Sequence, residues 1–199
     1  ALYAVLADLG YFSIKELSKL NKGGMLGEHP DHLIPGVEVV SGSLGHGLPI
    51  ASGMALADKL DNKKDRRTYI ILGDGECYEG SVWEAALFAA HHKLNNLIAI
   101  VDRNRLITFG STEDINSLEP FNHKWQSFGW EIFEEDAHNC NSLVDIFNKI
   151  HLSKSGKPSL LIAKSVKGKG VSFMENKAQW HHGGIDEEKY KLAKKELSK

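Results

Sequence analysis

The chain has 199 residues, of which 42% are hydrophobic, so it can bury one substantial core and is expected to form a single domain over residues 1–199. Its 24 basic and 26 acidic residues give a net charge of -2. The chain therefore lacks the excess of positive charge that is typical of proteins that bind nucleic acids or membrane surfaces. No apolar run approaches the ~20 residues of a membrane span, and no signal segment opens the sequence. The two cysteines form no disulfide framework or CxxC pair, so a reducing, cytoplasmic location is expected.

The first forty residues predict two helices and a long loop. Residues 1–9 have a helical pattern that ends at Gly10, although no capping side chain precedes the first apolar residue. Residues 13–20 predict a second helix with Ser13 as its cap. Residues 20–40 are rich in Gly, Pro and His and predict an irregular segment, which in a compact domain is usually functional or disordered.

Helical and strand-like segments alternate through the rest of the chain. In chain order, the expected elements are helix 44–60, strand 68–72, helix 79–93, strand 96–102, strand 130–135, helix 141–154, strand 158–165 and helix 185–197. Strands separated by helices form parallel βαβ units. The predicted fold class is therefore α/β, a doubly wound, mostly parallel sheet flanked by helices, in which ligands bind beyond the carboxyl ends of the strands.

An acidic turn, GDGECYEG, follows the first predicted strand. Gly73 and Gly75 allow a tight turn and a close backbone approach on either side of Asp74. The N-terminal amides of the next helix would point to the same place and suit phosphate oxygens. Because a carboxylate repels a bare diphosphate, the turn makes sense if a divalent cation lies between them.

Asn104 follows the second predicted strand, thirty positions after Asp74. If the two strands are neighbours, their ends lie ~5–10 Å apart. The Asp74 carboxylate, the Asn104 amide oxygen and the Leu106 carbonyl are hard oxygen ligands. With two phosphate oxygens and a water they would complete the octahedron that Mg²⁺ prefers.

The residues of the acidic turn allow other interpretations besides a cation site. Asp74 is also a plausible local cap in a simple strand-to-helix turn. A nicotinamide or flavin nucleotide is disfavoured, because the glycines at 73, 75 and 80 do not follow GxGxxG and Asp102 is a weak candidate for the ribose acid. The sequence also has no P-loop.

Three longer segments, taken together with the acidic turn, make the chain resemble the transketolase family of thiamine-diphosphate enzymes. They are HPDHLIPGVEVVSGSLGHGLPIASGMALA at 29–57, LNNLIAIVDRNRLITFG at 94–110 and WHHG at 180–183. The resemblance is continuous from residue 1 to about 184. It implies a thiamine-diphosphate-binding fold with thiamine diphosphate and Mg²⁺ or Ca²⁺ as cofactors.

The resemblance assigns roles to particular positions. It implies that Asp74, Asn104 and the Leu106 carbonyl hold the cation, and that Gly73 and Gly75 flank the turn nearest the diphosphate. It further implies the following set: Gly42, Ser43 and Leu44 line the aminopyrimidine, His29 lies near the substrate C1 hydroxyl, and His182 is shared between the diphosphate and the donor sugar.

Four positions, Ser43 among them, have a qualified match. Glu79 and Glu84 match acids that link cofactor sites across a subunit interface, although surface helix acids need no such role. His46 stands where the family usually has Gln, and Ser43 replaces the usual Pro. These two departures leave the cofactor assignment intact and affect the choice of substrate.

The resemblance implies a transferase that moves a two-carbon ketol unit between sugar phosphates. The family's activating Glu lies on a separate pyrimidine-binding domain, which the 199 residues do not contain, and the family's earlier N-terminal element is also expected to be missing. The chain alone is therefore expected to be inactive, and to work as a homodimer of a longer chain or a heterotetramer of split subunits. The alternatives are an α-type subunit of a 2-oxoacid decarboxylating complex and a non-catalytic module of the same fold.

Overall fold

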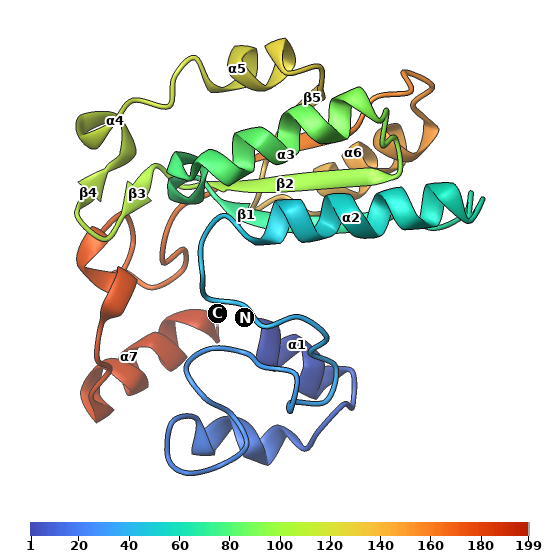
Figure 1. Ribbon diagram of the computed structural model, residues 1–199. Helices are drawn as coiled ribbons and strands as arrows, with labels where there is room; N and C mark the ends of the chain where they lie inside the picture. Colours follow the sequence, from blue (N-terminus) through green and yellow to red (C-terminus); the bar gives the residue numbers. More distant parts are fainter. Residues whose placement is uncertain (199) are drawn as a thin grey trace. The chain divides into compact units, whose positions relative to one another are not determined.

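Four parallel strands lie at the centre of the larger part of the chain in the structure, a computed structural model that describes residues 1–198 (Figure 1). The strands are β1 (Thr68–Gly73), β2 (Leu97–Arg103), β5 (Glu131–Asp136) and β6 (Ser159–Lys164), in the spatial order β1-β2-β6-β5. All three neighbouring pairs are parallel. The predicted α/β class with a parallel sheet is confirmed.

Helices cover both faces of this sheet. On one face lie α2 (Gly47–Leu60), α3 (Gly80–His91) and α5 (Phe121–Ser127), and on the other lies α6 (Cys140–Leu152) (Figure 1). The sheet is therefore doubly wound, as the alternation of segments predicts.

The side-chain alternation of β2 explains how one strand contributes to two cores. Leu97, Ala99 and Val101 belong to the core under α2, α3 and α5, whereas Ile98 packs in the core under α6. These side chains are at most 1% exposed. A strand buried on both faces reads as a continuous apolar run, which is what LIAIV is.

The order of the strands creates a crevice between β2 and β6. The step from β1 to β2 and the step from β5 to β6 run in opposite directions across the sheet. Since parallel crossovers are right-handed, α3 and α6 must lie on opposite faces. The segments that leave β2 and β6 diverge, and in open α/β sheets this is the place where ligands bind.

Shorter elements follow the strand ends. They are η2 (Gly75–Tyr78), the antiparallel pair β3 (Leu106–Ile107) and β4 (Gly110–Ser111), α4 (Thr112–Ile115), η3 (Ala178–His182) and α7 (Glu187–Leu197). Of these, only α7 is predicted from the sequence. Every helix in residues 1–198 is too short or too polar to span a bilayer.

Residues Ala1–His46 form a separate compact unit. It contains α1 (Leu2–Asp8) and the short 3-10 helix η1 (Ile14–Lys19), and no regular element follows within it. The helix predicted at 1–9 and the irregular segment at 20–40 are confirmed. The second predicted helix is a 3-10 helix, capped by Ser13 Oγ, which accepts a hydrogen bond from the Lys15 amide at 3.3 Å.

Candidate functional site

Asp74 stands directly after β1 and is 1% exposed. Its Oδ1 accepts a hydrogen bond from the Gly75 amide at 2.8 Å, so it caps η2. The turn itself contains this 3-10 segment, and the helix predicted at 79–93 follows it as α3, which begins at Gly80. The interpretation of Asp74 as a local cap describes a real contact, but this contact uses only one of the two carboxylate oxygens.

The second oxygen joins the turn to the segment after β2. Asp74 Oδ2 accepts a hydrogen bond from the Arg105 amide at 2.6 Å. β1 and β2 are directly paired, with Gly73 opposite Asp102. The predicted proximity of Asp74 to the chain around Asn104 is thus confirmed.

Asn104 and Leu106 form a tight turn beside Asp74. The Asn104 Oδ1 accepts a hydrogen bond from the Leu106 amide at 2.9 Å. Gly75 lies against the same segment, because a Cβ at Gly75 would be 2.4 Å from Cγ2 of Ile107. Glycine is therefore needed at 75 for this close approach.

A buried arginine, which sequence reasoning missed, lies between the two turns. Arg103 is 4% exposed, and its Nη1 donates to Asp74 Oδ2 at 3.1 Å. The signal was present in the sequence. Strand alternation puts residue 103 on the same face as Leu97, Ala99 and Val101, so a charged side chain was due to be buried there.

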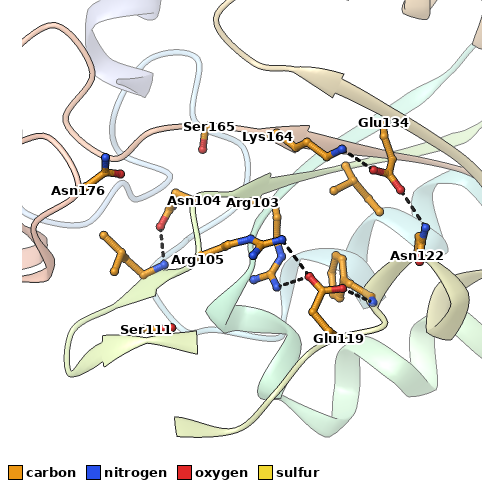
Figure 2. Close-up of a pocket in the computed structure, with 13 residues that line it drawn as sticks. Arg103, Asn104, Arg105, Ser111, Glu119, Asn122, Glu134, Lys164, Ser165 and Asn176 are labelled. Atoms are coloured by element: carbon orange, nitrogen blue, oxygen red, sulfur yellow. Dashed lines mark hydrogen bonds and ion pairs between the residues drawn. The ribbon is translucent and has the colours of Figure 1, made fainter. Parts of the chain in front are cut away.

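A pocket of about 540 Å³ opens between the ends of β2 and β6 (Figure 2). Asn104 and Leu106 line it, together with Lys164 and Ser165 at the end of β6. Asp74 is not among the lining residues. The pocket therefore lies at the crevice that the strand order creates.

The electrostatics of the turn are those of a buried, hydrogen-bonded carboxylate. Burial raises the pKa of Asp74 above its usual value, and hydrogen bonds from the Arg105 amide, Arg103 and the Gly75 amide oppose this rise. Partial burial would also raise the pKa of Glu113, but the hydrogen bonds that it accepts, led by those from Ser117 and Arg103, outweigh it and lower the pKa to about 2.

The oxygen atoms at this turn fit a hard divalent cation. Each carboxylate or amide oxygen has two lone pairs. Asp74 Oδ1 and Asn104 Oδ1 each accept one hydrogen bond in the structure, so one lone pair remains on each oxygen. Within residues 1–198, no group of three or more His, Cys, Asp or Glu side chains could hold a metal. A cation at this turn would therefore depend on amide and carbonyl oxygens in addition to Asp74.

His182 ends η3, which packs beside β3. Its ring lies 4.8 Å from that of His181, and both histidines are exposed. Partial burial and the nearby charge of Lys167 lower the pKa of His181. His182 does not line the pocket described above, so its predicted role in catalysis stays a prediction.

The predicted site residues before residue 47 lie in the N-terminal unit. His29 and Gly42 contact each other there, since a Cβ at Gly42 would lie 2.3 Å from the His29 ring and the φ of Gly42 is +119°. Ser43 and Leu44 follow Gly42 and are exposed, as is His46 at the end of the unit. Their predicted roles toward the aminopyrimidine and the substrate stay predictions.

The remaining acids have ordinary positions. Glu79 is the residue before α3, without a capping hydrogen bond from its side chain, and Glu84 is an exposed residue of α3. Asp102 accepts a hydrogen bond from the Ser165 hydroxyl. The predicted roles of Glu79 and Glu84 at a subunit interface stay untested.

Comparison with known proteins identifies the family of the chain. Residues 1–198 match the family model described as transketolase, thiamine diphosphate binding domain. The chain is 44% identical to one subunit of the apulose-4-phosphate transketolase of Phocaeicola vulgatus, over 100% of this chain and 70% of that protein. It is 43% identical to the 6-deoxy-6-sulfo-D-fructose transketolase subunit SqwG of Clostridium sp., over 100% of this chain and 72% of that protein.

Solved structures give the same result. The transketolase of Pichia stipitis in complex with sedoheptulose-7-phosphate superposes with a TM-score of 0.90 at 28% identity, over 99% of this chain and 31% of that one. The chain thus spans about a third of the length of this solved transketolase. The matched family model and the two subunit relatives show that the chain belongs to the transketolase family, in its thiamine diphosphate binding domain.

Proposed function

We propose that the chain is the diphosphate-binding part of a transketolase, which transfers a two-carbon ketol unit from a ketose phosphate donor to an aldose acceptor. Its cofactors would be thiamine diphosphate and Mg²⁺, or Ca²⁺ in its place. The activating Glu would come from a pyrimidine-binding partner, either a second subunit in a heterotetramer or a further domain in a homodimer of a longer chain. The reaction would take place in the cytoplasm.

The observation that carries this proposal is the junction of Asp74 with the segment after β2. The Asp74 carboxylate accepts a hydrogen bond from the Arg105 amide at 2.6 Å. This bond holds Asn104 and Leu106 next to the acidic turn. Both subunit relatives are named as transketolases of sugar-derived substrates, which supports a ketose donor over a 2-oxoacid.

The chain's own residues would bind the cation, orient the cofactor and exchange protons with the sugar substrates. Asp74, Asn104 and the Leu106 carbonyl would hold the cation, and the close approach of Ile107 to Gly75 would keep this segment beside the turn that faces the diphosphate. When bound, thiamine diphosphate supplies the carbon nucleophile that takes up and releases the ketol unit. His29 and His182 would exchange protons with sugar hydroxyl or carbonyl oxygens, which imidazole can do near neutral pH.

Calorimetry tests the cofactor site. We expect thiamine diphosphate to bind the chain, assembled with a pyrimidine-domain partner, in Mg²⁺ but not in EDTA, because Asp74 would hold the cation that offsets the charge of the diphosphate. The Asp74→Ala variant should lose this binding. Binding that is equal in EDTA, or unchanged in Asp74→Ala, would refute the proposed ligand set.

A turnover assay tests the reaction and the need for a partner. We expect no ketol transfer by the chain alone and transfer from a ketose phosphate once the partner is added, because the activating Glu lies on the partner. Turnover of a 2-oxoacid instead would favour the decarboxylating alternative. Cofactor binding without any turnover in the assembled complex would favour a non-catalytic module.

A further inference from the structure

A buried guanidinium occupies the space between the acidic turn and the segment that follows β4. The side chain of Arg103 is 3% exposed, and its Cζ lies 5.2 Å from the centre of the Phe121 ring. A buried charge is costly unless it is paired and hydrogen-bonded. The hydrogen-bond partners of Arg103 therefore indicate which segments this side chain holds together.

Arg103 contacts three carboxylates and one hydroxyl. Nη1 donates to Asp74 Oδ2 at 3.1 Å and to Thr112 Oγ1 at 3.0 Å. Nη2 donates to Glu113 Oε1 at 2.6 Å and to Glu119 Oε1 at 3.0 Å. The planar fork of a guanidinium can serve several acceptors in fixed directions, which an ammonium group cannot do.

These contacts leave Asp74 with one direction for a cation. Oδ2 accepts both Arg103 Nη1 and the Arg105 amide, so its two lone pairs are used. Oδ1 accepts only the Gly75 amide among its described contacts and keeps one lone pair. The arginine thus fixes the rotation of the carboxylate.

The charge of Arg103 would oppose a cation if it stood alone. However, Glu113 and Glu119 both pair with its Nη2, and Arg105 Nη2 also pairs with Glu119 Oε1, so the two arginines and two acids together carry no net charge. Because its charge is neutralised, Arg103 does not repel a cation from Asp74. Its contribution is to orient the Asp74 carboxylate through a hydrogen bond.

We propose that Arg103 is a positioning residue of the cation site, which locks Asp74 Oδ2 so that Oδ1 faces the divalent cation and which ties the acidic turn to residues 112–119. This inference rests on the proposed function, because it takes Asp74 to be a cation ligand. It adds to the site a residue that acts through Asp74 and is not itself a cation ligand.

Hydrogen exchange measured by mass spectrometry tests the locking without any cofactor. We expect peptides that cover residues 104–120 to exchange about tenfold faster in Arg103→Met than in the wild-type chain, while peptides from α6 are unchanged. Arg105→Met is the matched control. It removes only an exposed ion pair with Glu119, which contributes little, and the Arg105 backbone amide still donates to Asp74. Unchanged exchange over 104–120 in Arg103→Met would overturn the proposal.

A second measurement tests the cation. With thiamine diphosphate present, a Mn²⁺ titration followed by electron paramagnetic resonance should show at least about tenfold weaker binding in Arg103→Met, the usual effect of losing a partner that orients a ligand. Arg105→Met should bind within about twofold of wild type. Equal or tighter binding of Mn²⁺ in Arg103→Met would mean that the guanidinium does not position Asp74 for the cation.

Two further outcomes keep the proposal and the proposed function apart. If the wild-type chain in its assembled complex binds no Mn²⁺, the proposed function fails, while the exchange data still decide whether Arg103 locks the turn. If Arg103→Met unfolds, so that α6 also loses protection, Arg103→Lys replaces it. Arg103→Lys should fold, and its amides should be better protected from hydrogen exchange at residues 104–106 than at 112–119. Equal protection of both segments would count against the claim that the planar guanidinium is needed to hold them together.

Discussion

Single glycines at the acidic turn differ in what surrounds them. A Cβ at Gly75 would lie 2.4 Å from Ile107 Cγ2, whereas a Cβ at Gly73 would meet nothing within 4 Å. Gly75→Ala should therefore force β3 away from the turn and lower the free energy of unfolding by about 1–3 kcal/mol, the usual cost of overpacking. Urea denaturation of the cofactor-free chain measures this change.

Gly73→Ala is the control for that experiment. Its unfolding free energy should stay within about 0.5 kcal/mol of the wild-type value, since the new methyl group meets no neighbour.

The rise in melting temperature that Mg²⁺ and thiamine diphosphate produce should also be smaller in Gly75→Ala than in the wild-type chain, because Leu106 moves with Ile107. Equal stability of the two variants would show that the contact with Ile107 is not tight.

The ligand residues and the buried arginine were not equally predictable. Asp74 and Asn104 could be found because each follows an apolar run, and the ends of adjacent parallel strands meet at one edge of a sheet. The burial of Arg103 follows from strand alternation. Its acceptors do not, because Glu113 and Glu119 lie in a segment without a helical or strand period.

At the scale of elements, the segment that begins with α4 is held by carboxylates in addition to Leu118, which is buried in the core. Glu113 Oε2 accepts hydrogen bonds from the Ser117 hydroxyl at 2.6 Å and from the Glu119 amide at 3.3 Å, in addition to the contact of Oε1 with Arg103. These contacts lower the pKa of Glu113 to about 2 in the folded chain, against the partial burial that acts to raise it.

This lowered pKa predicts a loss of stability in acid. The unfolded chain binds the proton at Glu113 more readily than the folded chain, so the stabilisation is complete above the ordinary glutamate pKa of about 4.3 and declines as the pH falls toward 2. The difference in unfolding free energy between wild type and Glu113→Gln should therefore be constant at pH 6–7 and shrink between pH 5 and 3. Urea titrations at each pH measure it.

Asp114→Asn provides the comparison for the acid titration. Asp114 is the exposed neighbour of Glu113 in α4, and its side chain makes none of these hydrogen bonds. Its variant should follow the wild-type profile at every pH. A Glu113→Gln profile that ran parallel to wild type down to pH 3 would contradict the lowered pKa.

The elements that the sequence did not predict are the short ones. β3 and β4 have two residues each, too few to show a period. α5 has seven residues, with Phe121 and Trp125 as its buried positions, and this pair at i and i+4 is too little to distinguish from a loop. The long helices and strands, in contrast, carry enough repeats to show their type.

At the scale of the whole molecule, alternation of helices and strands predicts a parallel sheet but not the order of its strands. The chain passes from β2 to the far edge at β5 and returns to β6 in the middle. No crossover length determines which neighbour a strand takes. The crevice between β2 and β6 could therefore be predicted as a type of site, but its position could not.

The pairing of β1 with β2 has a consequence for how the chain tolerates changes of length. Gly73 stands opposite Asp102, and this alignment brings the segment that contains Asn104 beside Asp74, where the Arg105 amide donates to the carboxylate. A single-codon insertion within β2 would shift Asn104 by about 3.3 Å and turn Arg103 to the opposite face of the sheet. The same insertion at the tip between β3 and β4 would leave this alignment intact, so the gene can vary in length after the site but not in the strand that leads to it.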